Sequence, residues 1–155
     1  MSNQATNERL DQAIKEAARQ HSKDLEVLRM LKAALANEAI ALRAQNKELS
    51  QANIWQVVRR EVKKRQEAAK LYAAANRPAL ADKEQAELEV LSVYLPPAPS
   101  SEEIKEQIQR LKTELSLSDV KDRGRLTKAV LEHYQGLVDG GTVSNLIADS
   151  FNTQT

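Results

Sequence analysis

The sequence has no cysteine, four glycines, four prolines and 3% aromatic residues over 155 positions. Without cysteine, disulfide bonds and thiolate chemistry are excluded. So few turn-forming residues indicate helices instead of many short strands. No stretch approaches the roughly 18 apolar residues of a membrane span, and the polar N-terminal segment does not resemble a secretory signal. We therefore expect an all-α protein with a cytoplasmic location and no membrane partner.

The chain is instead rich in Ala, Leu, Glu, Lys, Arg and Gln, which are strong helix formers. Charged residues make up 29% of it, yet 23 basic and 22 acidic residues leave a formal net charge of +1. Because the net charge is so small, no global field draws the protein to nucleic acid. Any electrostatic function must come from local separation of charge.

Apolar residues recur at intervals of three and four, the spacing of amphipathic helices. The pattern predicts helices over residues 7–19, 24–45 and 52–75. Pro78 suits the first turn of a fourth helix, where its missing N–H costs nothing. That helix ends before Pro96, because a residue that precedes proline disfavours the helical region.

The best domain boundary is the rigid segment from Pro96 to Ser100. Ser100 with Glu103 forms the sequence pattern of a capping box, which predicts that a fifth helix begins there. We therefore expect an N-terminal helical domain built on a long helix hairpin over residues 1–98. A small C-terminal three-helix domain is expected over residues 99–155.

Three further local signals refine this reading. Ser50 is a candidate N-cap for the third helix. Gly124 falls early in a sixth segment and indicates a turn or a close helix contact. Thr142, after the Asp139-Gly140-Gly141 turn, is the predicted cap of a last short helix.

A basic run lies in the third predicted helix, between residues 59 and 70. Six cations against Glu61 and Glu67 give it a local charge of +4: Arg59, Arg60, Lys63, Lys64, Arg65 and Lys70. A helix of this kind can pack on its apolar side and present cations outward, and phosphate is the natural ligand of such a row. The alternative is a solvated face, neutralised across the hairpin by acids of the fourth helix: Asp82, Glu84, Glu87 and Glu89.

Arg65 differs from the other cations because it falls inside the apolar stripe of its helix, between Val62 and Ala69. An unpaired charge in that position is costly, so the side chain must reach solvent or find a carboxylate. Glu38 and Glu87 are the candidate partners. We interpret Arg65 as part of a structural ion pair.

Motifs of catalysis and of metal binding are missing from the sequence. There is no nucleophile elbow, P-loop or dinucleotide fingerprint. His21 and His133, the two histidines, lie in different halves and outside any metal-ligand spacing. We therefore expect no catalytic residues, no metal and no cofactor.

Three segments carry a family likeness: LRMLKAALANEAI over residues 28–40, RREVKKRQEAAKLYAAANRPAL over 59–80, and EQAELEVLSVYLP over 84–96. In their order they resemble the YqeY family, which is similar to the C-terminal tail of the GatB component of the glutamyl/aspartyl-tRNA amidotransferase. The likeness continues through Gly124 and the Asp139-Gly140 turn. The positions that match the family signature are Arg29, Lys32, Asn37-Glu38, Lys63, Arg65, Arg77, Leu80, Glu84, Glu87 and Tyr94-Leu95-Pro96.

This resemblance implies an all-α accessory module of aminoacyl-tRNA metabolism that contacts tRNA or other RNA. The chain lacks the parts of a complete amidotransferase, although its family label carries carbon–nitrogen ligase activity with glutamine as amido-N-donor. The alternative is a protein-interaction module that docks on an aminoacyl-tRNA synthetase or an amidotransferase. For RNA, the candidate phosphate contacts lie in both domains: Arg59, Arg60, Lys63, Lys64, Arg123, Arg125 and Lys128.

Overall fold

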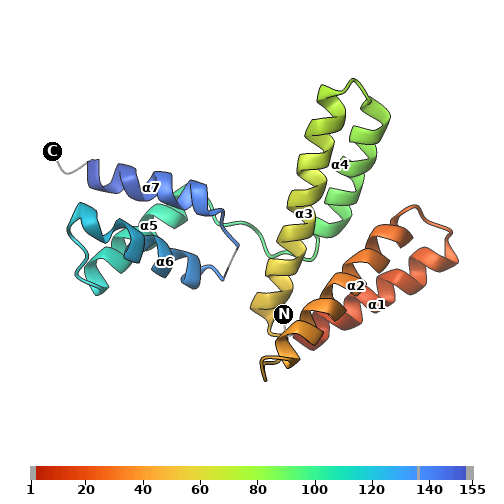
Figure 1. Cartoon of the computed structure of the whole chain (residues 1–155), viewed down its shortest axis with the longest axis horizontal. Helices are drawn as coiled ribbons and strands as arrows, with labels where there is room; N and C mark the ends of the chain where they lie inside the picture. Colours follow the sequence, from red (N-terminus) through yellow and green to blue (C-terminus); the bar gives the residue numbers. More distant parts are fainter. Residues whose placement is uncertain (1–2, 136, 153–155) are drawn as a thin grey trace. The chain divides into compact units, whose positions relative to one another are not determined.

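The computed structural model describes residues 3–135 and 137–152, and every regular element in these ranges is a helix (Figure 1). The all-α prediction is therefore confirmed. The chain divides into two compact units, Met1–Leu95 and Pro96–Thr155. The first contains α1 (Asn3–Arg19), α2 (Asp24–Arg43), α3 (Gln51–Ala74) and α4 (Pro78–Ser92). The second contains α5 (Ser101–Glu114), a 3₁₀ turn (Val120–Asp122), α6 (Arg123–His133) and α7 (Gly140–Asn152).

Short connections between the helices of the first unit use residues that tolerate a left-handed backbone. His21, Asn46 and Asn76 have φ of 51°, 57° and 55°, and each follows a helix that it helps to end. Ser50 is confirmed as the N-cap of α3, because its side chain accepts a hydrogen bond from the Asn53 N–H. These local signals are why the helix boundaries lie within four residues of those predicted.

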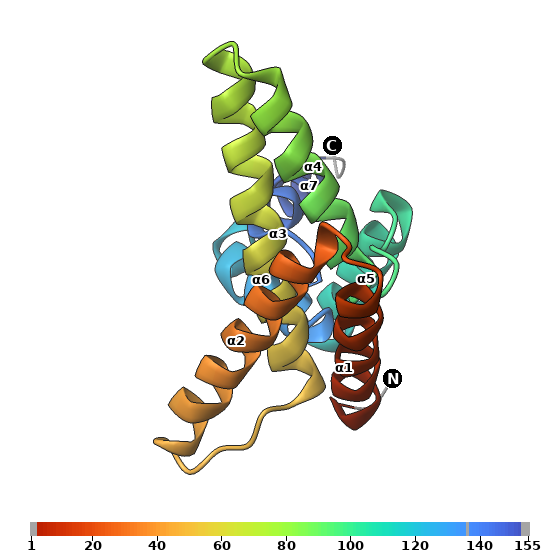
Figure 2. The ribbon, with the colours of Figure 1, turned by 90° about the vertical axis from the view of Figure 1, so that its right-hand side faces the viewer.

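The core of the first unit draws on all four of its helices. Leu10, Leu31, Ile54 and Leu91 are each at most 1% exposed and come from α1, α2, α3 and α4 in turn. Burying such a side chain contributes about 1.5–3 kcal/mol. Helices α3 and α4 pack closely along their lengths, and their outer ends extend past the α1–α2 pair (Figure 2). The core therefore holds the base of this hairpin.

A separate core lies in the second unit. Ile108 from α5, Leu126 and Val130 from α6, and Val143 from α7 are fully buried at 0% exposure. Together with Ile147, at 1%, they bring the three helices into one cluster. No residue of the first core takes part in it.

The start of α5 has the predicted capping box. The Ser100 side chain accepts a hydrogen bond from the Glu103 N–H, while the Glu103 carboxylate accepts one from the Ser100 N–H at 2.7 Å. These hydrogen bonds from Ser100 hold the pKa of Glu103 below its ordinary value of 4.5, since they favour the charged carboxylate.

Two local predictions for the second unit were wrong. Thr142 does not cap α7, which already begins at Gly140; the Asp139 carboxylate accepts a hydrogen bond from the Thr142 N–H at 3.0 Å instead. Gly124 marks neither a turn nor a close contact, because it lies within α6 and a Cβ added to it would meet nothing within 4 Å.

No helix in the described ranges is long and apolar enough to cross a membrane.

The two separate cores predict that the units unfold independently. We expect Leu126→Ala, in a fully buried α6 position, to destabilise the second unit by about 2–5 kcal/mol, because it leaves a cavity. Trp55, the single tryptophan, lies on α3 and reports on the first unit. Urea unfolding followed by circular dichroism should gain an early transition, while the midpoint of tryptophan fluorescence stays unchanged.

Ile54→Ala is the matched control, since Ile54 is equally buried in the first core. It should lower the fluorescence midpoint. If either substitution moved both transitions together, residues 1–98 and 99–155 would not be separate folding domains.

Candidate nucleic-acid interface

The basic run lies on the part of α3 that follows its buried first half. Ile54, Val57 and Val58 face the core, and the helix then presents Arg60, Lys63 and Lys64 to solvent. Arg59, the remaining predicted phosphate contact on α3, is half-buried and interacts with other groups of the protein. The structure thus places three of the four predicted cations on the outer surface of the helix.

Ion pairs distinguish among these three exposed cations. A guanidinium nitrogen of Arg60 lies 3.3 Å from a Glu38 carboxylate oxygen, and Lys64 Nζ lies 2.7 Å from a carboxylate oxygen of Glu61. Lys63 forms no ion pair with any residue that the structure describes. The same holds for Lys70, which lies two helical turns further along α3. Exposed pairs such as Arg60–Glu38 contribute at most about 1 kcal/mol, so they open readily to a phosphate.

Arg65 is held against carboxylates of both hairpin helices. Its Nε lies 2.7 Å from Glu87 and 3.6 Å from Glu84 on α4, and its Nη1 lies 3.9 Å from Glu61 one turn back on α3. The side chain is only 11% exposed. Of the two partners considered from the sequence, Glu87 contacts Arg65, whereas Glu38 contacts Arg60.

This network decides where the acids of α4 point. Glu84 and Glu87 are half-buried and lie against Arg65, and Glu87 also lies 3.6 Å from Lys83 on its own helix. Glu89 is exposed and accepts a hydrogen bond from Gln85 on its own helix, 3.3 Å away. Two of the four acids expected to neutralise the basic face are therefore occupied by a buried arginine.

Glu61 is a member of this network that the sequence did not single out. It is 7% exposed and contacts both Lys64 and Arg65. Its position one turn before Arg65 was a usable signal, because residues four apart lie on one face of a helix. In the sequence it was counted only as a charge that reduced the basic run.

The three candidate cations of the second unit have different surroundings. Arg125 lies 3.7 Å from Asp122, and Lys128 lies 3.9 Å from Glu132; both cations are largely exposed. Arg123 is half-buried, and its Cζ lies 5.8 Å from the centre of the Phe151 ring. From the sequence the three cations were equivalent candidates, but in the structure Arg123 lies near an aromatic ring, whereas Arg125 and Lys128 lie near carboxylates.

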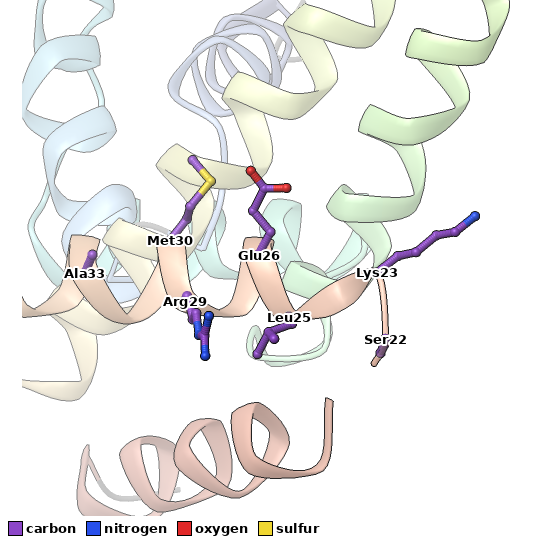
Figure 3. A pocket seen from close by; sticks show the side chains of 7 residues that line it. All are labelled: Ser22, Lys23, Leu25, Glu26, Arg29, Met30 and Ala33. Atoms are coloured by element: carbon purple, nitrogen blue, oxygen red, sulfur yellow. The ribbon is translucent and has the colours of Figure 1, made fainter. Parts of the chain in front are cut away.

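A shallow cleft of about 550 Å³ lies along α2 in the first unit (Figure 3). Its acidic and basic side chains diverge: Glu26 projects from one side of the helix, as does Met30, and Arg29 projects from the other. A nucleophile that is activated by a base lies within hydrogen-bond reach of that base. The side chains that line this cleft do not form such a pair.

Comparison with known proteins identifies the chain's relatives at the level of a family. The family model described as Yqey-like protein matches residues 7–151, which is nearly the whole chain. None of the curated proteins matches the sequence.

The Arg65 network predicts a clear stability effect. We expect Arg65→Met to destabilise the first unit by about 3 kcal/mol, because it removes the cation that all three carboxylates share and leaves Glu84 without an ion-pair partner among the described residues. Urea unfolding followed by Trp55 fluorescence measures this change. Arg60→Met is the matched control, since its exposed ion pair with Glu38 contributes less than about 1 kcal/mol. Equal effects of the two substitutions would contradict a structural role specific to Arg65.

Proposed function

This chain belongs to the Yqey-like protein family, and we propose that it is an RNA-binding module, with tRNA as its partner, accessory to aminoacyl-tRNA metabolism. It acts by binding and carries no catalytic centre of its own. The observation that carries the proposal is the exposed row of cations on α3, while Glu84 and Glu87 of α4 lie against Arg65.

Charge separation on the hairpin supports phosphate as the ligand. Exposed lysine and arginine side chains contact phosphate with little loss of their own packing, and each contact releases a counterion from the nucleic acid. Lys63 has no competing ion pair within the described ranges, and Arg60 has an exposed one, whereas Lys64 lies 2.7 Å from the carboxylate of Glu61. A helix that is held at its base and projects outward can approach a nucleic-acid backbone.

A docking role on a synthetase or an amidotransferase is the second candidate, favoured by one specific observation. Leu71 near the tip of the hairpin is 71% exposed, and Leu80 across the turn is 39% exposed. Apolar side chains in such a position are typical of protein contacts, which persist at high salt. In this case capture of a synthetase should survive nuclease treatment and disappear with Leu71→Lys.

The RNA proposal predicts strongly salt-dependent binding. We expect fluorescently labelled tRNA to bind at 50 mM KCl, with an affinity that falls linearly on a log–log plot as salt increases. Replacing Arg60, Lys63 and Lys64 together with Gln should reduce the salt slope by about 2–3, since each lost phosphate contact contributes about 0.9. Filter binding or fluorescence anisotropy measures both quantities.

The control removes three exposed cations elsewhere in the first unit: Lys15, Arg19 and Lys47, each replaced with Gln. It has the same net charge as the α3 variant and should keep a slope close to that of the wild type. A lack of tRNA binding even at low salt would contradict the proposal. Equal losses of tRNA affinity in both variants would show that binding depends on the total charge of the protein and not on the α3 surface.

A further inference from the structure

Three helices of the second unit bring two cations against one aromatic ring. Lys112 Nζ, from α5, lies 3.9 Å from the centre of the Phe151 ring on α7, and Arg123 Cζ, from the start of α6, lies 5.8 Å from it. Lys112 is only 8% exposed, whereas Arg123 and Phe151 are half-buried, so parts of these two side chains are accessible to solvent.

The hydrogen-bonding potential of these cations is only partly used. Lys112 donates a hydrogen bond to the Ser150 carbonyl at 3.2 Å, and the Nε of Arg123 is buried without any acceptor. Neither side chain forms an ion pair with a carboxylate in the part of the chain that the structure describes. Arg125 and Lys128 on the same helix do have such partners, at 3.7 Å and 3.9 Å.

Contacts with the ring compensate for only part of this cost. A cation over an aromatic face gains about 0.5–2 kcal/mol, less than the penalty for burying an unpaired charge. The two distances to one ring also keep the charges within about 10 Å of each other, which is one Debye length at 0.1 M salt. The cations therefore repel each other, and an anion beside them would remove both costs.

We propose that Lys112, Arg123 and Phe151 form an anion site that takes a phosphate group of the RNA backbone. This inference rests on the proposed function and extends it to the second unit. Phosphate suits the cluster because its several acceptor oxygens can use the fork of an arginine and the point charge of a lysine at once. The ring positions the two cations, and phosphate neutralises them.

The first experiment tests the site without RNA. Inorganic phosphate is titrated into the full-length ¹⁵N-labelled protein, at constant ionic strength set with KCl, and the arginine Nε–Hε signals are followed by NMR. The Arg123 signal is assigned by its loss in Arg123→Gln. We expect it to shift with a midpoint several-fold lower than that of any other arginine. An Arg123 shift no larger than that of Arg125 would overturn the site.

The second experiment asks whether RNA supplies the phosphate. We expect Arg123→Gln to weaken tRNA binding about five- to tenfold and to reduce the salt slope by about 1, as for one lost phosphate contact. Arg110→Gln is the matched control, with the same charge change at an exposed position of α5 in the same unit. It should change affinity less than about twofold. Equal losses in the two variants would overturn a specific contact of Arg123.

Two further results keep this inference separate from the proposed function. If phosphate shifts the Arg123 signal but the wild type binds no tRNA, the cluster is a phosphate site and the proposal that RNA supplies the phosphate is wrong. If tRNA binds but phosphate leaves Arg123 unmoved, the site fails and the α3 interface stands. Should Arg123→Gln unfold the second unit, Arg123→Lys keeps the charge but loses the fork, and we expect it to retain part of the affinity.

Discussion

The contact of Arg65 with carboxylates from both hairpin helices is the interaction on which the proposed interface depends. Arg65 lies against Glu84 and Glu87 of α4 and also reaches Met30 of α2, so this largely buried cation aligns α3 with its neighbouring helices. The same contact draws Glu84 and Glu87 inward. One arginine thus joins the two helices of the hairpin and engages two of the acids of α4.

In the second unit, by contrast, charge is left uncompensated. Arg125 and Lys128 have acidic partners on their own helix or in the turn before it, as exposed cations commonly do. Lys112 and Arg123 have an aromatic ring and a carbonyl group instead. A protein with nearly equal numbers of acids and bases can therefore present local positive sites, because pairing is decided residue by residue and not by net charge.

Much of the secondary structure could be predicted because its signals are local. The caps at Ser50 and Ser100 depend on residues only three positions away, and Pro78 needs no distant partner to start a helix. The wrong cap at Thr142 shows the limit of such signals: Asp139, three residues earlier, satisfies the Thr142 N–H, so α7 begins before the residue expected to cap it. Two residues close together in the chain can each be suited to cap the same helix, and the sequence alone does not show which of them does so.

The sequence by itself determined the helices, the apolar stripes, the family and the inward position of Arg65, because each follows from helical spacing or from residue order. Only the tertiary structure decided which carboxylates reach Arg65 and which cations keep a free charge. Lys112 marks the difference: it continues the series of Ile104 and Ile108 at intervals of four, yet its ring partner is 39 residues away, on another helix. Electrostatic pairing depends on distances of a few ångströms between side chains far apart in the chain, and helical periodicity carries no information about them.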